Sequence, residues 1–185
     1  MQIQTLSIPD IKIFTPKKFG DERGFFSETY SKKHLSEKGI EINFVQDNHA
    51  YSAHAHTMRG MHFQIAPFAQ DKLIRVIRGA ILDVVVDIRC GSPSYGHHVS
   101  VVISVDQWNQ ILVPAGFAHG LLTLENDTEV IYKVSNYYSP EHDKGLLWND
   151  PDLGIDWQVS EEEVILSEKE RHQPRLKDLP EYFEY

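Results

Sequence analysis

Four histidines lie within fourteen positions of the chain, and the last of them belongs to the segment TMRGMHFQ (57–64). A cluster of imidazoles is typical of a metal site, because neutral histidine is a common ligand of transition metals. A single histidine beside an arginine and apolar residues instead suggests a base for proton transfer. The four residues are His49, His54, His56 and His62.

The metal alternative draws further support from VPAGFAHG (113–120). A Pro-x-Gly-x-x-His turn entering a strand is the second half of the cupin-barrel signature, and the first half is His-x-His followed by a glutamate. Here no carboxylate follows His54 and His56 through Gly60, and Arg59 places a positive charge where a cation would sit. We therefore interpret His54 and His56 as loop residues and predict no metal site.

The composition narrows the class of protein. A length of 185 residues with 41% hydrophobic and 24% charged residues suits one globular domain, and no apolar run could span a bilayer. The net charge of −9, without a basic block, argues against nucleic acid and anionic membranes as partners. Cys90 is the only cysteine, so no intrachain disulfide can form, and with no apparent signal peptide we expect a cytoplasmic location.

The elements that must position these residues are mostly strands. One short helix is predicted over SKKHLSEKG (31–39), with Ser31 as its N-cap and Gly39 as its stop. Segments rich in β-branched residues follow at short spacing, and we expect the first two to pair as a hairpin at a glycine. The predicted strands cover residues 72–79, 80–89, 97–105, 109–114 and 128–134. This pattern predicts an antiparallel sandwich or barrel.

Alternation within AILDVVVDIR (80–89) puts Asp83, Val85 and Asp87 on one face of a strand. Two acids on one face fit either a solvated outer surface or the polar lining of a barrel. Strand parity alone leaves both alternatives open.

Nine segments together resemble one known family, the dTDP-4-dehydrorhamnose 3,5-epimerases, a metal-free branch of the cupins in deoxysugar biosynthesis. In the order of that family they are GDERGFFSETY (20–30), FVQDNH (44–49), RGMHFQ (59–64), QDKLIRVIRG (70–79), ILDVVVDIRCGSPSYG (81–96), ILVPAGFAHG (111–120), YKVSNYYSP (132–140), LLWNDPDLGIDW (146–157) and LSEKE (166–170). The resemblance implies an all-β, cupin-type antiparallel β-barrel (jelly roll) with a few short helices. It further implies one domain over residues 1–185, with an N-terminal arm over about 1–30 and a tail over about 158–185.

The same resemblance implies an activity. Family members invert C3 and C5 of dTDP-4-keto-6-deoxyglucose in dTDP-rhamnose biosynthesis, by removing and returning a proton beside the C4 ketone. Removal of either proton gives an enolate, so the site must supply a base, stabilisation of the oxygen anion and an acid on the opposite face. The reaction needs no cofactor, and the sequence contains no GxGxxG phosphate loop.

His62 aligns with the base of the family. Its partner there is an aspartate in an LSxKD motif, and this sequence has Glu170 at that position, within LSEKE. The resemblance therefore implies a His62–Glu170 pair. The additional methylene of glutamate leaves the reach and angle of this pair in question.

Four further residues align with catalytic positions of the family. Lys72 and His119 correspond to the groups near the C4 oxygen, and Asp83 to the carboxylate that pairs with the histidine. Tyr132 corresponds to the acid, which suits a phenol because its pKa near 10 keeps it protonated at neutral pH.

Nucleotide binding in the family involves two sets of positions. Within one subunit they correspond to Gln46, Asn48, Arg59 and Tyr138. An arm exchanged between the subunits of a homodimer adds positions that correspond to Arg23, Phe25 or Phe26, and Glu28. Arginine suits a diphosphate because its planar fork forms paired, charge-assisted hydrogen bonds.

Three alternatives stay open at the level of sequence. One is a family member that epimerises C3 only, in another deoxysugar pathway. Another is a metal-dependent cupin that uses His54, His56 and His119. The last is a non-catalytic sugar-nucleotide binding protein, suggested by the glutamate at position 170.

Overall fold

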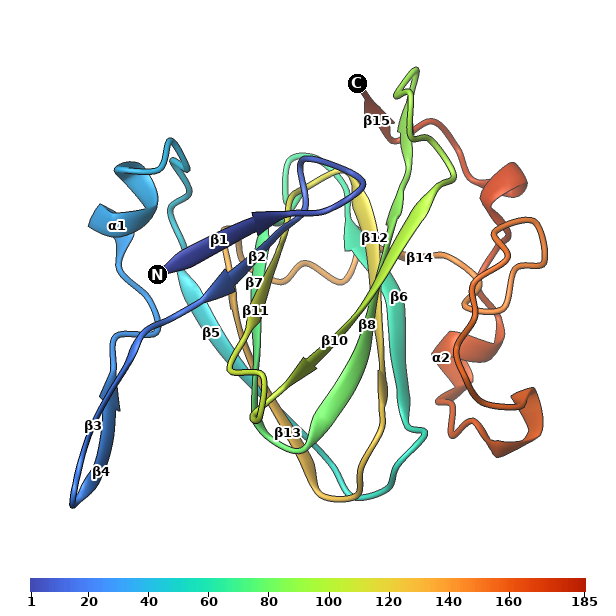
Figure 1. The fold of residues 1–185 in the computed structure, drawn as a ribbon. Helices are drawn as coiled ribbons and strands as arrows, with labels where there is room; N and C mark the ends of the chain where they lie inside the picture. The colour runs from blue at the N-terminus through green and yellow to red at the C-terminus, as the bar shows by residue number, and fades with distance from the viewer.

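The structure of the protein, a computed structural model, describes all 185 residues. Two antiparallel sheets face each other to form a jelly-roll barrel. The C-terminal segment covers the outside of one sheet, while an N-terminal hairpin extends away from the barrel (Figure 1). The predicted all-β class is confirmed.

Six strands form the first sheet and five form the second. In spatial order the first contains β1 (Gln2–Thr5), β2 (Lys12–Thr15), β11 (Gln110–Val113), β7 (Lys72–Arg78), β13 (Thr128–Val134) and β5 (Gln46–Ser52). The second contains β10 (His98–Ser104), β8 (Ala80–Asp87), β12 (Phe117–Thr123), β6 (Met58–Gln64) and β14 (Asp143–Gly145). The strands predicted over 97–105, 109–114 and 128–134 are confirmed, with shorter bounds for the first two.

The remaining elements are short. They are the hairpin β3 (Lys18–Asp21) and β4 (Gly24–Ser27), the helices α1 (Lys32–Ser36) and α2 (Glu168–Arg171), the 3-10 turns η1 (Glu161–Glu163) and η2 (Leu176–Asp178), and the strands β9 (Arg89–Cys90) and β15 (Phe183–Glu184). Helix α1 confirms the predicted helix and its cap, because the Ser31 hydroxyl accepts a hydrogen bond from the His34 amide. No helix is long and apolar enough to cross a membrane.

The connection between β7 and β8 differs from the predicted hairpin. The two strands lie in different sheets, so the turn at Gly79 carries the chain across the barrel. Gly79 has φ of +78°, and a Cβ there would lie 2.5 Å from the Thr128 hydroxyl oxygen. The prediction was wrong because a glycine between two β-branched runs marks a sharp reversal without specifying which strands pair across it.

Strand β8 is buried on both faces. Ile81 and Val85 belong to the apolar cluster inside the barrel, and Leu82, Val84 and Val86 pack in a second cluster outside it. Asp83 shares the inner face by parity and is completely buried. Of the two alternatives for the acidic face, the structure therefore selects the barrel lining.

The second cluster lies under the C-terminal segment. Trp148 and Trp157 are buried in it, and Phe63 of β6 contacts Tyr182 and Phe183 of the tail with ring centroids 5.8 and 6.1 Å apart. The aromatic tail thus packs on the barrel of its own chain. This packing also holds α2 beside β6.

Candidate active site

Strand β6 carries His62 to the inside of the barrel. In the pairing between β6 and β12, His62 lies opposite His119. The two strands approach closely because Gly60 faces Gly120, and a Cβ on Gly60 would collide with the Gly120 backbone. The glycine in TMRGMHFQ thereby permits the register that brings two histidines together.

Glu170 reaches His62 despite its longer side chain. Its Oε1 lies 3.3 Å from His62 Nε2, although the angles do not meet those of a hydrogen bond. Its Oε2 accepts hydrogen bonds from the amide and the hydroxyl of Ser167, and the bond from the amide belongs to the capping box of α2. One buried carboxylate therefore caps the helix with one oxygen and faces the imidazole with the other.

His62 lies in a positive environment. Burial and the charges of Lys169 and Lys72 together lower the pKa of its imidazole to about 4, against the opposing effect of Glu170 and Asp143. The imidazole is therefore neutral at neutral pH. A neutral imidazole can accept a proton.

Lys72 begins β7 and points toward His62. Its Nζ donates a hydrogen bond to the His62 carbonyl at 3.2 Å. Burial lowers the pKa of Lys72 to about 8, while the carboxylates of Asp143 and Asp83 oppose this shift. The ammonium is charged at neutral pH and has no carboxylate in direct contact, so it can interact with a developing oxygen anion.

His119 and Asp83 form a buried pair. His119 Nε2 lies 2.8 Å from Asp83 Oδ2, and the second oxygen of Asp83 has no hydrogen-bond partner. The carboxylate fixes the orientation of the ring and favours a proton on Nε2. Asp83 and His119 thus form the pair expected from the sequence.

Tyr132 of β13 lies in the same sheet as Lys72 and faces His62 and His119 of the opposite sheet. Burial and the charge of Asp143 raise the pKa of its phenol, and Arg59 partly offsets this. The phenol therefore stays protonated at neutral pH. A single cavity of about 200 Å³ is lined by all of these functional groups except Asp83: Arg59, His62, Lys72, His119, Tyr132 and Glu170.

A neighbouring cavity of about 170 Å³ shares His62, Lys72 and Tyr132 with the first. Gln46, Asn48 and Tyr138 line it, and Gln46 Nε2 donates to Asn48 Oδ1 at 2.7 Å. The structure therefore brings these predicted binding residues next to the predicted catalytic ones. The chain provides two joined compartments, one rich in proton-transfer groups and one lined by amides and a tyrosine.

Arg59 lies at the edge of the first cavity. Its guanidinium donates to the Ser52 hydroxyl at 3.0 Å and to the Tyr51 carbonyl at 2.9 Å. No carboxylate pairs with it, so its charge is free for an anionic ligand.

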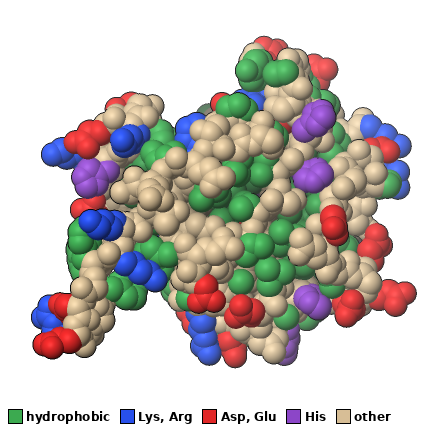
Figure 2. All heavy atoms as spheres, viewed as in Figure 1, with side chains coloured by type: hydrophobic (Ala, Val, Ile, Leu, Met, Phe, Trp, Pro, Cys, Tyr) green, Lys and Arg blue, Asp and Glu red, His purple; other side chains and the backbone are tan.

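The predicted arm residues lie away from both cavities. Arg23 is at the tip of the β3–β4 hairpin, paired with Asp21 at 2.5 Å, and Phe26 is 69% exposed. The hairpin projects from the body of the molecule (Figure 2). Glu28 follows it and lies 2.7 Å from His34. Within one chain these residues do not join the site.

His54 and His56 lie in the turn between β5 and β6, as predicted for loop residues. His56 is held at the end of β12, where its amide donates to the Thr123 carbonyl at 2.7 Å. His119 lies four residues before Thr123 on the same strand, inside the barrel. No three His, Cys, Asp or Glu side chains are grouped closely enough to hold a metal ion.

The sequence model of the dTDP-4-dehydrorhamnose 3,5-epimerase family matches residues 5–178. A dTDP-4-dehydrorhamnose 3,5-epimerase of Sinorhizobium fredii is 50% identical over 185 residues, which cover all of this chain and 94% of the relative. The chain belongs to this family.

Solved structures of 3,5-epimerases agree with the fold. An epimerase from Bacillus anthracis, crystallised with TDP and pyrophosphate, superimposes with a TM-score of 0.91 at 49% identity over 94% of this chain and 98% of that chain. An epimerase from Legionella pneumophila in complex with dTDP-4-keto-L-rhamnose gives 0.94 at 39% identity, over 100% and 98%. The cupin-type barrel is therefore the architecture that this chain shares with the 3,5-epimerases.

Two residues of this epimerase-family site were missed from the sequence. Asp143 lines the second cavity, and its carboxylate accepts hydrogen bonds from Lys169 Nζ at 2.5 Å and from the Tyr138 hydroxyl at 3.1 Å. In the sequence Asp143 falls in a turn-rich segment without periodicity, and only the structure shows that it begins β14 beside β6. Lys169, in contrast, is part of the LSEKE segment, so a signal for it was present.

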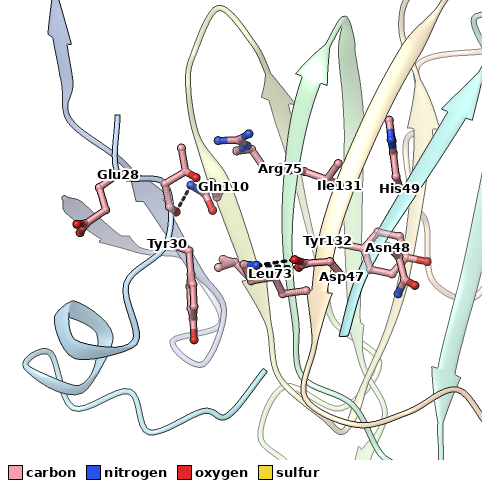
Figure 3. A pocket seen from close by; sticks show the side chains of 12 residues that line it. Glu28, Tyr30, Asp47, Asn48, His49, Leu73, Arg75, Gln110, Ile131 and Tyr132 are labelled. Carbon is pink, nitrogen blue, oxygen red and sulfur yellow. Dashed lines mark hydrogen bonds and ion pairs between the residues drawn. The ribbon is translucent and has the colours of Figure 1, made fainter. Parts of the chain in front are cut away.

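A larger cavity of about 520 Å³ lies on the outer face of the six-stranded sheet. Figure 3 shows Glu28 and Tyr30 of the N-terminal segment on one side, and residues of β5, β7 and β13 on the other. Arg75 points into it, and its Nε has no hydrogen-bond partner.

Proposed function

We propose that the chain catalyses the inversion of C3 and C5 in dTDP-4-keto-6-deoxyglucose, the reaction for which its relatives are named. The observation that carries the proposal is the single cavity in which His62, Lys72, His119 and Tyr132 meet. A base, a cation, a carboxylate-paired imidazole and a phenol are the groups that a proton transfer beside a ketone requires.

The reaction begins when neutral His62 removes the proton from C3. In this ring orientation Nε2 faces Glu170, which leaves Nδ1 free to take the proton. The electron pair of the broken C–H bond moves toward the C4 oxygen and forms an enolate. Lys72 and His119 stabilise that oxygen, and Glu170 stabilises the resulting imidazolium.

Tyr132 completes the inversion by giving its phenolic proton to the same carbon from the opposite face. The enolate reverts to the ketone, and the phenolate and the imidazolium return to their resting forms by proton exchange with water. A second cycle at C5 follows the same course, because C5 also flanks the C4 ketone. The low pKa of His62 keeps the base neutral before each cycle.

The nucleotide half of the substrate occupies the second compartment. Gln46, Asn48 and Tyr138 line it, and the unpaired guanidinium of Arg59 supplies charge for the diphosphate. These contacts account for the binding of an anion by a chain with a net charge of −9, since only the local charge matters for this contact.

The proposal includes a cytoplasmic homodimer in which each hairpin reaches the site of the other chain. Three phenylalanines of the hairpin, Phe19, Phe25 and Phe26, are 54–69% exposed, although the ring of Phe25 also meets Trp108 edge-on at 5.0 Å. Such a group of exposed aromatic side chains is typical of an interaction surface. The outer cavity of Figure 3, and the Arg75 Nε that has no hydrogen-bond partner there, support an interface on this sheet. Under this arrangement the positions of Arg23, Phe26 and Glu28 act on the substrate of the partner.

The test is isotope exchange in heavy water. Purified protein is incubated with dTDP-4-keto-6-deoxyglucose, and C3 and C5 are followed by NMR. Deuterium at both carbons is expected. Deuterium at C3 alone would identify a C3 epimerase instead, and no exchange at either carbon would favour a non-catalytic binding protein. Metal analysis of the same sample completes the test, because a stoichiometric metal required for activity would contradict the mechanism.

A further inference from the structure

Gln64 is the last residue of β6, two positions after His62, and its side chain is only 4% exposed. Its Nε2 donates hydrogen bonds to the Phe68 carbonyl at 2.7 Å and to the Tyr137 carbonyl at 3.0 Å. Its Oε1 accepts a hydrogen bond from the Ser139 amide at 2.7 Å. The amide thus uses both donors and its acceptor on backbone groups of two different loops.

This arrangement requires a primary amide. Glutamine and asparagine carry two donors on the amide nitrogen and an acceptor on the amide oxygen. A carboxylate has no donor, and an apolar side chain has neither donor nor acceptor. A shorter asparagine would place the amide one methylene away from its three partners. The chemistry at position 64 is therefore specific for glutamine.

The bonds of Gln64 bracket Tyr138. Tyr137 and Ser139 are its two neighbours in sequence, so the backbone is held on both sides of a side chain that is itself 59% exposed. The Tyr138 hydroxyl donates to Asp143, which lies opposite Gln64 in the pairing of β14 with β6. The ring of Tyr138 is thereby fixed at both ends.

The other loop leads into β7 and Lys72. Besides the bond from Gln64 to Phe68, two contacts join this loop to the one that carries Tyr138. Asn136 Nδ2 donates to the Pro67 carbonyl at 2.9 Å, and Gln70 Nε2 donates to the Asn136 carbonyl at 2.7 Å. Of the side chains that join the two loops, Gln64 is buried and is the one that contacts both sequence neighbours of Tyr138.

We propose that Gln64 is a positioning residue for nucleotide binding, which acts by holding Tyr138 at the wall of the second cavity. The inference rests on the proposed function for the identity of the ligand. Gln64 also lines this cavity, but its amide nitrogen already donates to two backbone carbonyls, so it has no free donor for the substrate. Its effect is transmitted through the backbone of residues 137–139. It therefore contributes to binding and leaves the proton-transfer groups in place.

The experiment is a double-mutant cycle on the binding of thymidine diphosphate, measured by calorimetry. Gln64→Met and Tyr138→Ala are each expected to raise the Kd about tenfold, the range for loss of an aromatic contact with a nucleotide. Combined, they are expected to weaken binding no more than the stronger single change, because both remove the same contact. In turnover, Gln64→Met is expected to raise KM while kcat stays within about twofold.

A matched control is available at the β10–β11 turn. Asn109 is 6% exposed, and its amide also makes three hydrogen bonds: to the Val102 carbonyl, to the Gln107 side chain and from the Ser104 amide. Asn109→Leu removes a buried amide of the same kind at a position that lines none of the three cavities. It is expected to lower the melting temperature as Gln64→Met does and to leave the Kd unchanged.

Additive effects in the double variant, or an equal rise of Kd in Asn109→Leu, would overturn the inference. If Gln64→Met does not fold, Gln64→Asn keeps the amide and tests the same point through its shorter reach. A wild-type protein that neither binds thymidine diphosphate nor exchanges deuterium would contradict the proposed function instead. A wild-type protein that does both, beside a Gln64→Met variant with unchanged Kd, would contradict only the role of Gln64.

Discussion

At the scale of the residue, the site depends on how charge is distributed around two histidines. His62 faces Glu170 at 3.3 Å but is also close to two lysines, and burial with their charges lowers its pKa. His119 is in direct contact with buried Asp83 at 2.8 Å. The two imidazoles therefore suit different roles: His62 is a neutral base, and His119 is an oriented hydrogen-bonding group.

The pKa values of His62 and Lys72 predict a bell-shaped pH profile of kcat/KM. Activity requires neutral His62, so it is expected to fall below a pH of about 4, and charged Lys72, so it is expected to fall above a pH of about 8. Steady-state kinetics across this range measures both limbs.

Lys72→Met is expected to lower kcat/KM by about a hundredfold and to abolish the alkaline limb. Persistence of that limb would assign it to another group.

Glu170 is predicted to support turnover through His62. Glu170→Gln removes the negative charge that stabilises the imidazolium, and we expect kcat to fall by about 100-fold, within the range for general acid–base groups. Glu168 provides the control, because it belongs to the same short helix and its side chain is 87% exposed. Glu168→Gln should retain wild-type kcat. Unchanged turnover in Glu170→Gln would refute the pair.

At the scale of the element, the barrel depends on where strands change sheet. Strands β7 and β8 are consecutive but lie in opposite sheets, so that β7 carries Lys72 and β8 carries Asp83 to facing walls. A hairpin would have placed them side by side in one sheet. The turn at Gly79 is therefore a determinant of the site as well as of the fold.

Substitution of Gly79 by alanine is predicted to destabilise the protein more than the same change at Gly91. Both glycines have positive φ, +78° and +81°, which costs an alanine about 1 kcal/mol or more. Only at Gly79 does a new Cβ meet another group, the Thr128 side chain, which adds about 1–3 kcal/mol. Thermal unfolding of both variants measures the difference. Equal melting temperatures would mean that Thr128 moves away at no cost.

At the scale of the whole molecule, charge and shape point to an assembly. The chain carries a net charge of −9, yet Lys72, Lys169 and Arg59 gather at the cavities. The hairpin with its exposed phenylalanines projects from the body (Figure 2). Its Arg23 lines none of the three cavities of its own chain. In the proposed homodimer, the hairpin of a second copy of the chain completes the site.

Complementation between two defective variants tests this arrangement. Arg23→Ala and His62→Ala are each expected to have little activity. If the arm acts on the partner, a heterodimer of the two contains one site with both residues intact, and random pairing restores about a quarter of wild-type activity. Co-expression with two affinity tags and an activity assay measures this. No recovery would mean that the arm serves its own chain.

The fold class, the roles of the clustered histidines and the family of this protein could be predicted from its sequence. The density of β-branched segments predicts an all-β fold, because such side chains suit a pleated surface. Because no carboxylate follows His54 and His56, the sequence already argues against a metal site at these two residues and gives them a different role from His62. Nine segments in the order of one family identify that family, which the comparisons confirm.

Other features were decided only by the tertiary structure. Alternation in β8 separates two faces but not inside from outside, because period two is the same for either orientation. The reach of Glu170 depends on where α2 docks against β6, a matter of packing under the tail. Asp143 enters the site from a segment without periodicity, and Gln64 meets Tyr137 and Ser139 from 73 and 75 positions away. Such contacts arise from packing between distant segments, which local sequence patterns do not encode.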